Sequence, residues 1–173
     1  MATKTYKIVC IGDSGVGKTS FIMRVFADIF DTKYNPTFKT TIRTITLLSN
    51  RGPIRMDLWD CPTTHRISQC YEEADMFLIF AALDDDKSQE SLNTWIKKVE
   101  NAQPDANIAI CLTKSDMVEN GYFETPSEYS GLTEFVDNFY IWEFSNKTTD
   151  KFSEVFHNIA RNLIHDDNIK ISR

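Results

Sequence analysis

Apolar runs and amphipathic helical segments alternate along the whole chain. Short runs that are nearly all apolar, or that alternate apolar and polar residues, are typical of strands. They predict strands over residues 7–11, 40–48, 54–59, 76–82, 108–112 and 139–144. Apolar residues three or four positions apart predict helices that begin near residue 18, span 88–102 and cover 152–163. This alternation favours an α/β fold with a mostly parallel sheet.

The same periodicity predicts which helical side chains face the core. In the first helix they are Phe21, Ile22, Val25 and Phe26. In the second they are Leu92, Trp95, Ile96 and Val99. The pattern contains no internal repeat, low-complexity tract or linker, so we expect residues 1–173 to form one domain.

Composition excludes several classes of function. The net charge of −6 argues against nucleic-acid binding, which needs a dense basic face. No apolar run reaches the roughly 18 residues that a membrane-spanning helix needs. The four cysteines show no zinc-site spacing, and Cys10 and Cys111 lie within apolar runs, so we expect buried thiols in a reducing, cytoplasmic compartment.

The strongest chemical signal follows the first predicted strand. Residues 12–19, GDSGVGKT, fit the pattern G-x-x-x-x-G-K-[ST] between a strand and a helix. The glycines let successive N–H groups face one anion, while Lys18 offers its charge to the β- and γ-phosphates and Thr19 its hydroxyl to Mg²⁺. The predicted phosphate-binding residues are Ser14, Gly15, Val16, Gly17, Lys18, Thr19 and Ser20.

This loop is common to ATPases, kinases and GTPases, so the base must be selected elsewhere. Residues 113–116, TKSD, end a buried strand, where ligands of parallel sheets bind. The carboxylate of Asp116 can accept hydrogen bonds from N1–H and the 2-amino group of guanine. Adenine offers neither donor in that arrangement.

With these motifs, Leu58-Trp59-Asp60, Tyr71 and Ser145-Asn146-Lys147, the chain resembles Ras-superfamily small GTPases over essentially its whole length, and the Rab branch in particular. The resemblance implies the P-loop NTPase (small G-protein) fold with a six-stranded sheet, bound GTP or GDP, and Mg²⁺. It also implies a switch in vesicle traffic whose effector and regulatory proteins contact residues 30–39 and 61–73.

The resemblance assigns roles to individual residues. The metal ligands would be Thr19, Thr37 and, through a water, Asp60. The switch residues near the γ-phosphate would be Tyr34, Thr37 and Thr63. The base-binding residues would be Phe30, Thr113, Lys114, Asp116, Ser145, Asn146 and Lys147. Among them Lys114 would cover the base and ribose, and the Asn146 N–H would border O6 of guanine.

The segment after Asp60 departs from the family pattern. Thr63 replaces a glycine whose N–H meets the γ-phosphate, and Thr64 replaces the glutamine that orients the attacking water. Pro62 fixes its own φ and Thr63 is β-branched, so this segment has less freedom to rearrange. We therefore expect slow GTP hydrolysis and name no catalytic residue; His65 is more typical of a solvated histidine than of a base.

Two further departures concern the base and the C-terminus. Thr113 replaces an asparagine, keeping a hydroxyl for the P-loop but losing the amide that reaches guanine N7, a bond worth roughly 0.5–1.5 kcal/mol. No cysteine follows Cys111, so the prenylated tail of Rab proteins is missing and membrane association is doubtful. A trimmed tail, a longer polypeptide peripheral to endomembranes, and a protein without an anchor all remain open.

Two other functions remain as alternatives. A non-cycling scaffold that holds one nucleotide permanently is favoured by Pro62, Thr63 and Thr64. The intact P-loop, Thr37 and Asp60 favour a cycling switch instead. A P-loop kinase is disfavoured because the chain has no arginine-rich lid.

Overall fold

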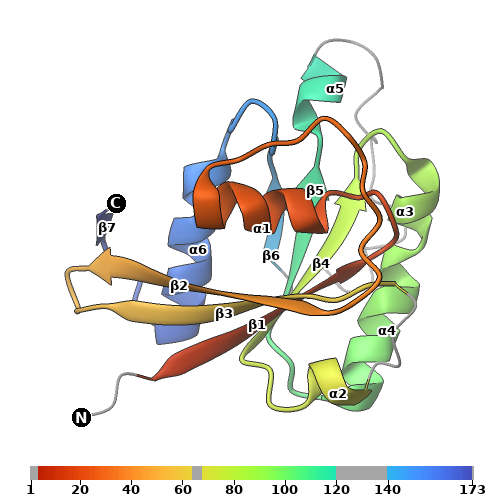
Figure 1. Ribbon diagram of the computed structural model, residues 1–173. Helices are drawn as coiled ribbons and strands as arrows, with labels where there is room; N and C mark the ends of the chain where they lie inside the picture. The colour runs from red at the N-terminus through yellow and green to blue at the C-terminus, as the bar shows by residue number, and fades with distance from the viewer. Residues whose placement is uncertain (1–3, 64–67, 120–139, 173) are drawn as a thin grey trace.

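A central sheet is covered by helices on both faces in the computed structural model, which describes residues 4–63, 68–119 and 140–172 (Figure 1). The strands are β1 (Thr5–Gly12), β2 (Thr41–Ser49), β3 (Ile54–Asp60), β4 (Met76–Ala82), β5 (Ile108–Thr113), β6 (Tyr140–Glu143) and β7 (Ile171–Ser172). The helices are α1 (Lys18–Ala27), α2 (Ser68–Tyr71), α3 (Asp86–Glu90), α4 (Leu92–Ala102), α5 (Ser115–Glu119) and α6 (Phe152–Ile164).

The strand order is β6-β5-β4-β1-β3-β2-β7. Strands β1, β3, β4, β5 and β6 are parallel to their neighbours in this group, and β2 runs antiparallel to β3. The predicted mostly parallel sheet of six strands is confirmed, and the two-residue β7 extends its edge by pairing with the end of β2. Because the parallel strands all end at one edge, the segments that follow β1, β3, β5 and β6 meet there.

Alternate residues of the strands enter two separate cores. On one face, Ile8 and Cys10 belong to a cluster with residues of α1 and α6. On the other, Val9 and Ile11 belong to a cluster with residues of α2 and α4. The fully buried ring of Phe21 lies at the centre of the first cluster, with the rings of Phe80, Phe144, Phe152 and Phe156 at centroid distances of 5.4–5.6 Å. This aromatic packing therefore anchors helix α1 immediately after the loop that joins β1 to it.

Two details of the predicted helices are wrong. Phe26 is 50% exposed, and its ring lies 5.5 Å from the guanidinium of Arg43 on β2. A rotation of about 100° per residue puts it at the rim of a stripe centred on Val25. The helix predicted over 88–102 begins at Asp86 and is interrupted at Ser91, whose hydroxyl donates to Lys87 O at 2.9 Å. Such bonds to a carbonyl one turn back bend helices.

The other predicted inner residues of this region, Leu92, Trp95, Ile96 and Val99, are buried as expected. All four cysteines are free and buried, which confirms the prediction for Cys10 and Cys111. Within the described ranges, no helix combines the length and the apolar character needed to cross a bilayer.

Candidate functional site

A cavity of about 530 Å³ lies at the carboxyl edge of the sheet. Residues at the N-terminal end of α1 line it. The segment that leaves α1 arches back over the helix towards that same end (Figure 1). Most of the predicted site residues line it: Ser14, Gly15, Gly17, Lys18, Thr19, Ser20, Phe30, Tyr34, Thr37, Thr63, Lys114, Asp116, Asn146 and Lys147. Val16, Thr113, Ser145 and Asp60 are buried and do not line it.

The backbone of the P-loop depends on glycine at two positions. Gly12 has φ 136°, and a Cβ there would lie 2.3 Å from the carbonyl oxygen of Phe80. Gly17 has φ 97° and precedes the first residue of α1. The first N–H groups of a helix lack partners within the helix, so this end of α1 offers donors and a positive dipole to an anion.

Lys18 is held inside this loop. Its ammonium donates to the carbonyl oxygens of Gly12 at 2.9 Å and Asp13 at 2.6 Å, and the residue is only 7% exposed. Burial lowers the pKa of Lys18 below its ordinary value, while the negative charge of Asp60 acts in the opposite direction. The ammonium therefore lies inside the loop, bonded to two of its backbone carbonyls.

The three predicted metal ligands converge. Thr19 Oγ1 donates to Asp60 Oδ2 at 2.6 Å and lies 2.8 Å from Thr37 Oγ1. Asp60 is 1% exposed, and its Oδ1 has no hydrogen-bond partner among the described residues. Burial raises the pKa of Asp60, partly opposed by the Thr19 hydrogen bond. Two hydroxyls and a carboxylate are the hard oxygen ligands that Mg²⁺ prefers, so the residues fit this metal.

The two switch segments both contact the P-loop. The hydroxyls of Tyr34 and Ser14 lie 2.5 Å apart. Thr63 Oγ1 donates to Gly12 O at 3.3 Å, and thus shares an acceptor with Lys18. Thr64 and His65, singled out in the sequence, lie outside the described residues.

The other end of the cavity holds the base motif. Asp116 is 5% exposed; its Oδ1 accepts from the Ser145 hydroxyl at 2.6 Å, and Lys147 Nζ lies 3.8 Å from its Oδ2. Lys114 has the left-handed φ of 63° and pairs with Asp84 at 2.8 Å. A non-glycine residue in this conformation is uncommon and is held by its surroundings. The base-binding roles stay predictions; the structure places these side chains together.

Thr113 connects the base motif to the P-loop. Its hydroxyl is completely buried and donates to Val16 O at 2.6 Å, with Ala81 O at 3.3 Å as a second acceptor. The predicted bond from the threonine hydroxyl to the P-loop is therefore present. Thr113 is buried and does not line the cavity, so its hydroxyl bond holds the backbone of the P-loop in shape.

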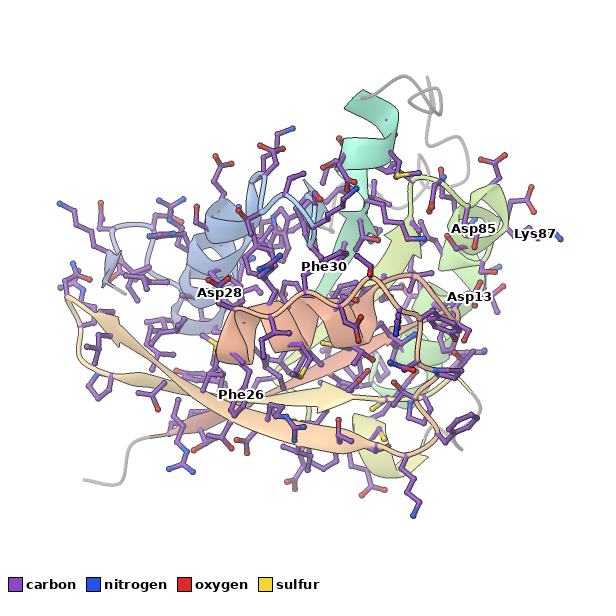
Figure 2. All side chains as sticks on the ribbon, turned by 45° about the horizontal axis from the view of Figure 1, so that its top comes forward. Asp13, Phe26, Asp28, Phe30, Asp85 and Lys87 are labelled. Atoms are coloured by element: carbon purple, nitrogen blue, oxygen red, sulfur yellow. The ribbon has the colours of Figure 1, made fainter. Side chains whose placement is uncertain are left out.

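Three contributors were missed by sequence reasoning. Arg24 on α1 donates to the carbonyls of Asn146 (2.9 Å) and Lys147 (3.2 Å). Its guanidinium also lies 5.6 Å from the ring centroid of Phe30, which Figure 2 places on the segment after Asp28. Trp95 and Asp84, partners of Asp13 and Lys114, are the other two. None belongs to a motif, and Arg24 is more than 120 residues from Asn146 and Lys147, so no local signal could reveal those two bonds.

Comparison with known protein families agrees with this arrangement. The sequence matches the family model described as Ras family over residues 7–165, a span that includes the P-loop, both switch segments and the base motif. Proteins of this family bind GTP or GDP together with Mg²⁺ and interact with effectors and regulators. This chain belongs to the Ras family of GTP-binding switch proteins.

Proposed function

We propose that this protein is a Rab-like GTP/GDP switch of vesicle traffic, formed by residues 1–173 as one domain, with slow intrinsic hydrolysis. The observation that carries the switch is the contact of Thr19 Oγ1 with Thr37 Oγ1 at 2.8 Å and Asp60 Oδ2 at 2.6 Å. These oxygens come from the P-loop helix, the first switch segment and the end of β3. A single cation held by all three would couple their positions.

Different residues of the chain would bind the phosphates, the metal and the base. The P-loop amides and Lys18 would bind the phosphates, and Thr19, Thr37 and Asp60 would hold Mg²⁺. Bound Mg²⁺ neutralises phosphate charge. Asp116 would accept from the guanine N1–H and 2-amino group while the Ser145 hydroxyl fixes its orientation at 2.6 Å. Phe30, half-buried against Arg24, would pack on the base.

Slow hydrolysis follows from the second switch segment. Phosphoryl transfer depends on positioning, and Thr63 Oγ1 bonds to Gly12 O at 3.3 Å where the family uses a mobile glycine. Pro62 is buried beside it. Without a glutamine at position 64 to orient the attacking water, we expect hydrolysis at or below the order of 10⁻⁴ s⁻¹ that Ras shows alone.

Effectors would recognise the first switch segment. Phe38 is 77% exposed and Tyr34 is 61% exposed, so this segment presents aromatic surface to a partner. A cytoplasmic protein, peripheral to endomembranes if it is part of a longer or modified chain, fits this role. The assignment to traffic rests on the likeness to Rab proteins.

A single-turnover assay tests the hydrolysis rate. Protein loaded with γ-labelled GTP and Mg²⁺ should release phosphate at or below the order of 10⁻⁴ s⁻¹. The double variant Thr63→Gly/Thr64→Gln should be faster. Release from the unmodified protein clearly faster than that order would overturn the proposal of slow hydrolysis.

The second candidate is a non-cycling scaffold, favoured by the bond between Thr63 and the P-loop. Hydrogen exchange distinguishes the two. A switch should show different protection of residues 30–39 with GDP and with a non-hydrolysable GTP analogue, whereas a scaffold should show the same protection with both.

A further inference from the structure

Two polar side chains meet at the last glycine of the P-loop. A Cβ built on Gly17 would lie 3.0 Å from Asn146 Nδ2 and 3.5 Å from Thr113 Oγ1. Thr113 comes from the end of β5 and Asn146 from the loop after β6. The two groups therefore occupy neighbouring positions at the junction of the phosphate and base ends of the cavity.

Thr113 has no donor left for a base. A hydroxyl carries one hydrogen, and that of Thr113 is directed to Val16 O at 2.6 Å or Ala81 O at 3.3 Å. The residue is fully buried and does not line the cavity. The contact to guanine N7 that an asparagine amide makes in the family cannot come from this side chain.

Asn146 has the donor that Thr113 lacks. Its amide nitrogen carries two hydrogens, one of which goes to Gly17 O at 3.2 Å. Asn146 lines the cavity, is only 5% exposed, and its Oδ1 has no partner within the described part of the chain. The unpartnered Oδ1 is an acceptor and cannot bond to N7; the second hydrogen of Nδ2 is the group for which an acceptor supplied by a ligand would be favourable.

Contacts with Arg24 and Gly17 fix the position of the Asn146 amide. Arg24 Nε donates to the backbone carbonyl of Asn146 at 2.9 Å, and Arg24 is itself seated on α1. The bond from Nδ2 to Gly17 O then orients the side chain toward the P-loop end of the cavity. The amide is thus positioned before any nucleotide enters.

We infer that the side-chain amide of Asn146 donates to N7 of guanine, which makes Asn146 a specificity-determining residue in place of position 113. The inference rests on the proposed guanine-nucleotide function. It extends the role implied by family resemblance, in which only the backbone N–H of Asn146 contacts the base.

Competition binding of GDP and 7-deaza-GDP, which lacks the N7 acceptor, tests it. The unmodified protein should prefer GDP by about 3- to 10-fold, the effect of one hydrogen bond. Asn146→Ala should bring the preference to about 1, and Thr113→Asn in the Asn146→Ala background should restore it. Asn93→Ala is the matched control because its amide oxygen is also buried and unpartnered but lies on α4 outside the cavity.

Each outcome decides the matter. Equal binding of the two nucleotides by the unmodified protein overturns the inference without any substitution and leaves the proposed function intact. A preference for GDP over 7-deaza-GDP that persists in a folded Asn146→Ala variant also overturns the inference and leaves the proposed function intact. Failure to bind either nucleotide overturns the proposed function together with the inference.

Discussion

The indole N–H of Trp95 on α4 donates a 2.9 Å hydrogen bond to a carboxylate oxygen of Asp13 in the P-loop. Asp13 is the residue whose backbone carbonyl holds Lys18, at 2.6 Å. The bond therefore ties the phosphate-binding loop to the helix layer on the opposite face of the sheet from α1.

Trp95→Phe should loosen this loop while keeping the aromatic packing. The loss of one hydrogen bond worth about 1 kcal/mol should speed GDP release roughly fivefold. Stopped-flow displacement of a fluorescent GDP measures this rate. Trp59→Phe is the control because the Trp59 indole nitrogen has no partner among the described residues. Equal acceleration by both substitutions would show that the Asp13 bond has no such role.

We expect Asp60 to make magnesium affinity sensitive to pH. Burial raises the pKa of Asp60 above its usual range, and a protonated carboxyl is a poor metal ligand. The Mg²⁺ dependence of GDP affinity should weaken as pH falls from neutrality, at a higher pH than an ordinary aspartate would titrate. The affinity of an Asp60→Asn variant should be lower and nearly independent of pH. A flat profile for the unmodified protein from pH 7 down to pH 4 would contradict this account.

The raised pKa of Asp60 also makes the stability of the unliganded protein depend on pH, and this stability contribution is lost as pH rises. A folded-state pKa above the unfolded one favours the protonated folded state, so this contribution to stability is complete below the unfolded pKa and is lost as pH rises through the folded pKa. Chemical denaturation of nucleotide-free protein should show Asp60→Asn stabilising the fold at neutral pH, with a smaller effect near pH 4. A destabilising effect at neutral pH would count against the assignment.

Gly12→Ala should be far more damaging than a glycine substitution elsewhere. The backbone at Gly12 has φ 136°, and the new Cβ would lie 2.3 Å from a main-chain oxygen of β4 that cannot move aside. We expect the free energy of unfolding to fall by more than about 3 kcal/mol. Gly52→Ala is the control: φ is 100° but nothing lies within 4 Å, so its cost should be about 1 kcal/mol. Urea denaturation that gave equal losses would refute the packing argument.

Asp116→Asn should change base preference. In the proposed function the carboxylate would accept from the guanine N1–H and 2-amino group, whereas an amide can donate to the 2-oxo group of xanthine. Two bonds to a charged acceptor are lost, so GDP affinity should fall by at least about 100-fold and xanthosine diphosphate should become the better ligand. Titration calorimetry with both nucleotides measures this, and an unchanged preference for GDP would place base selection elsewhere.

The sequence predicted the parts of the site that are local along the chain. The P-loop is one contiguous motif after a strand, and its shape follows from the glycines within it. Parallel strand order then requires that Asp60 and Asp116, each near the end of a strand, lie at the same edge as the P-loop. Residue type and strand position were therefore sufficient to predict that Asp60 and Asp116 lie beside the P-loop.

The remainder depends on packing that no local pattern encodes. Trp95 follows a core periodicity, and only the structure shows that its N–H reaches a residue 82 positions away. Phe26 satisfies the apolar pattern of α1 yet lies half exposed. Thr113 and Asn146 carry separate motif roles in the sequence, and their proximity at Gly17 emerges only when the loops after β5 and β6 are placed together.

The identity of the nucleotide carried by the purified full chain tests the central claim most directly. Mass spectrometry of the small molecules released on denaturation should find GDP or GTP, and titration of nucleotide-free protein with Mg²⁺ should show binding of GDP but not of ADP. A folded sample that carries no guanosine phosphate, and that cannot be loaded with one at high Mg²⁺, would contradict the account.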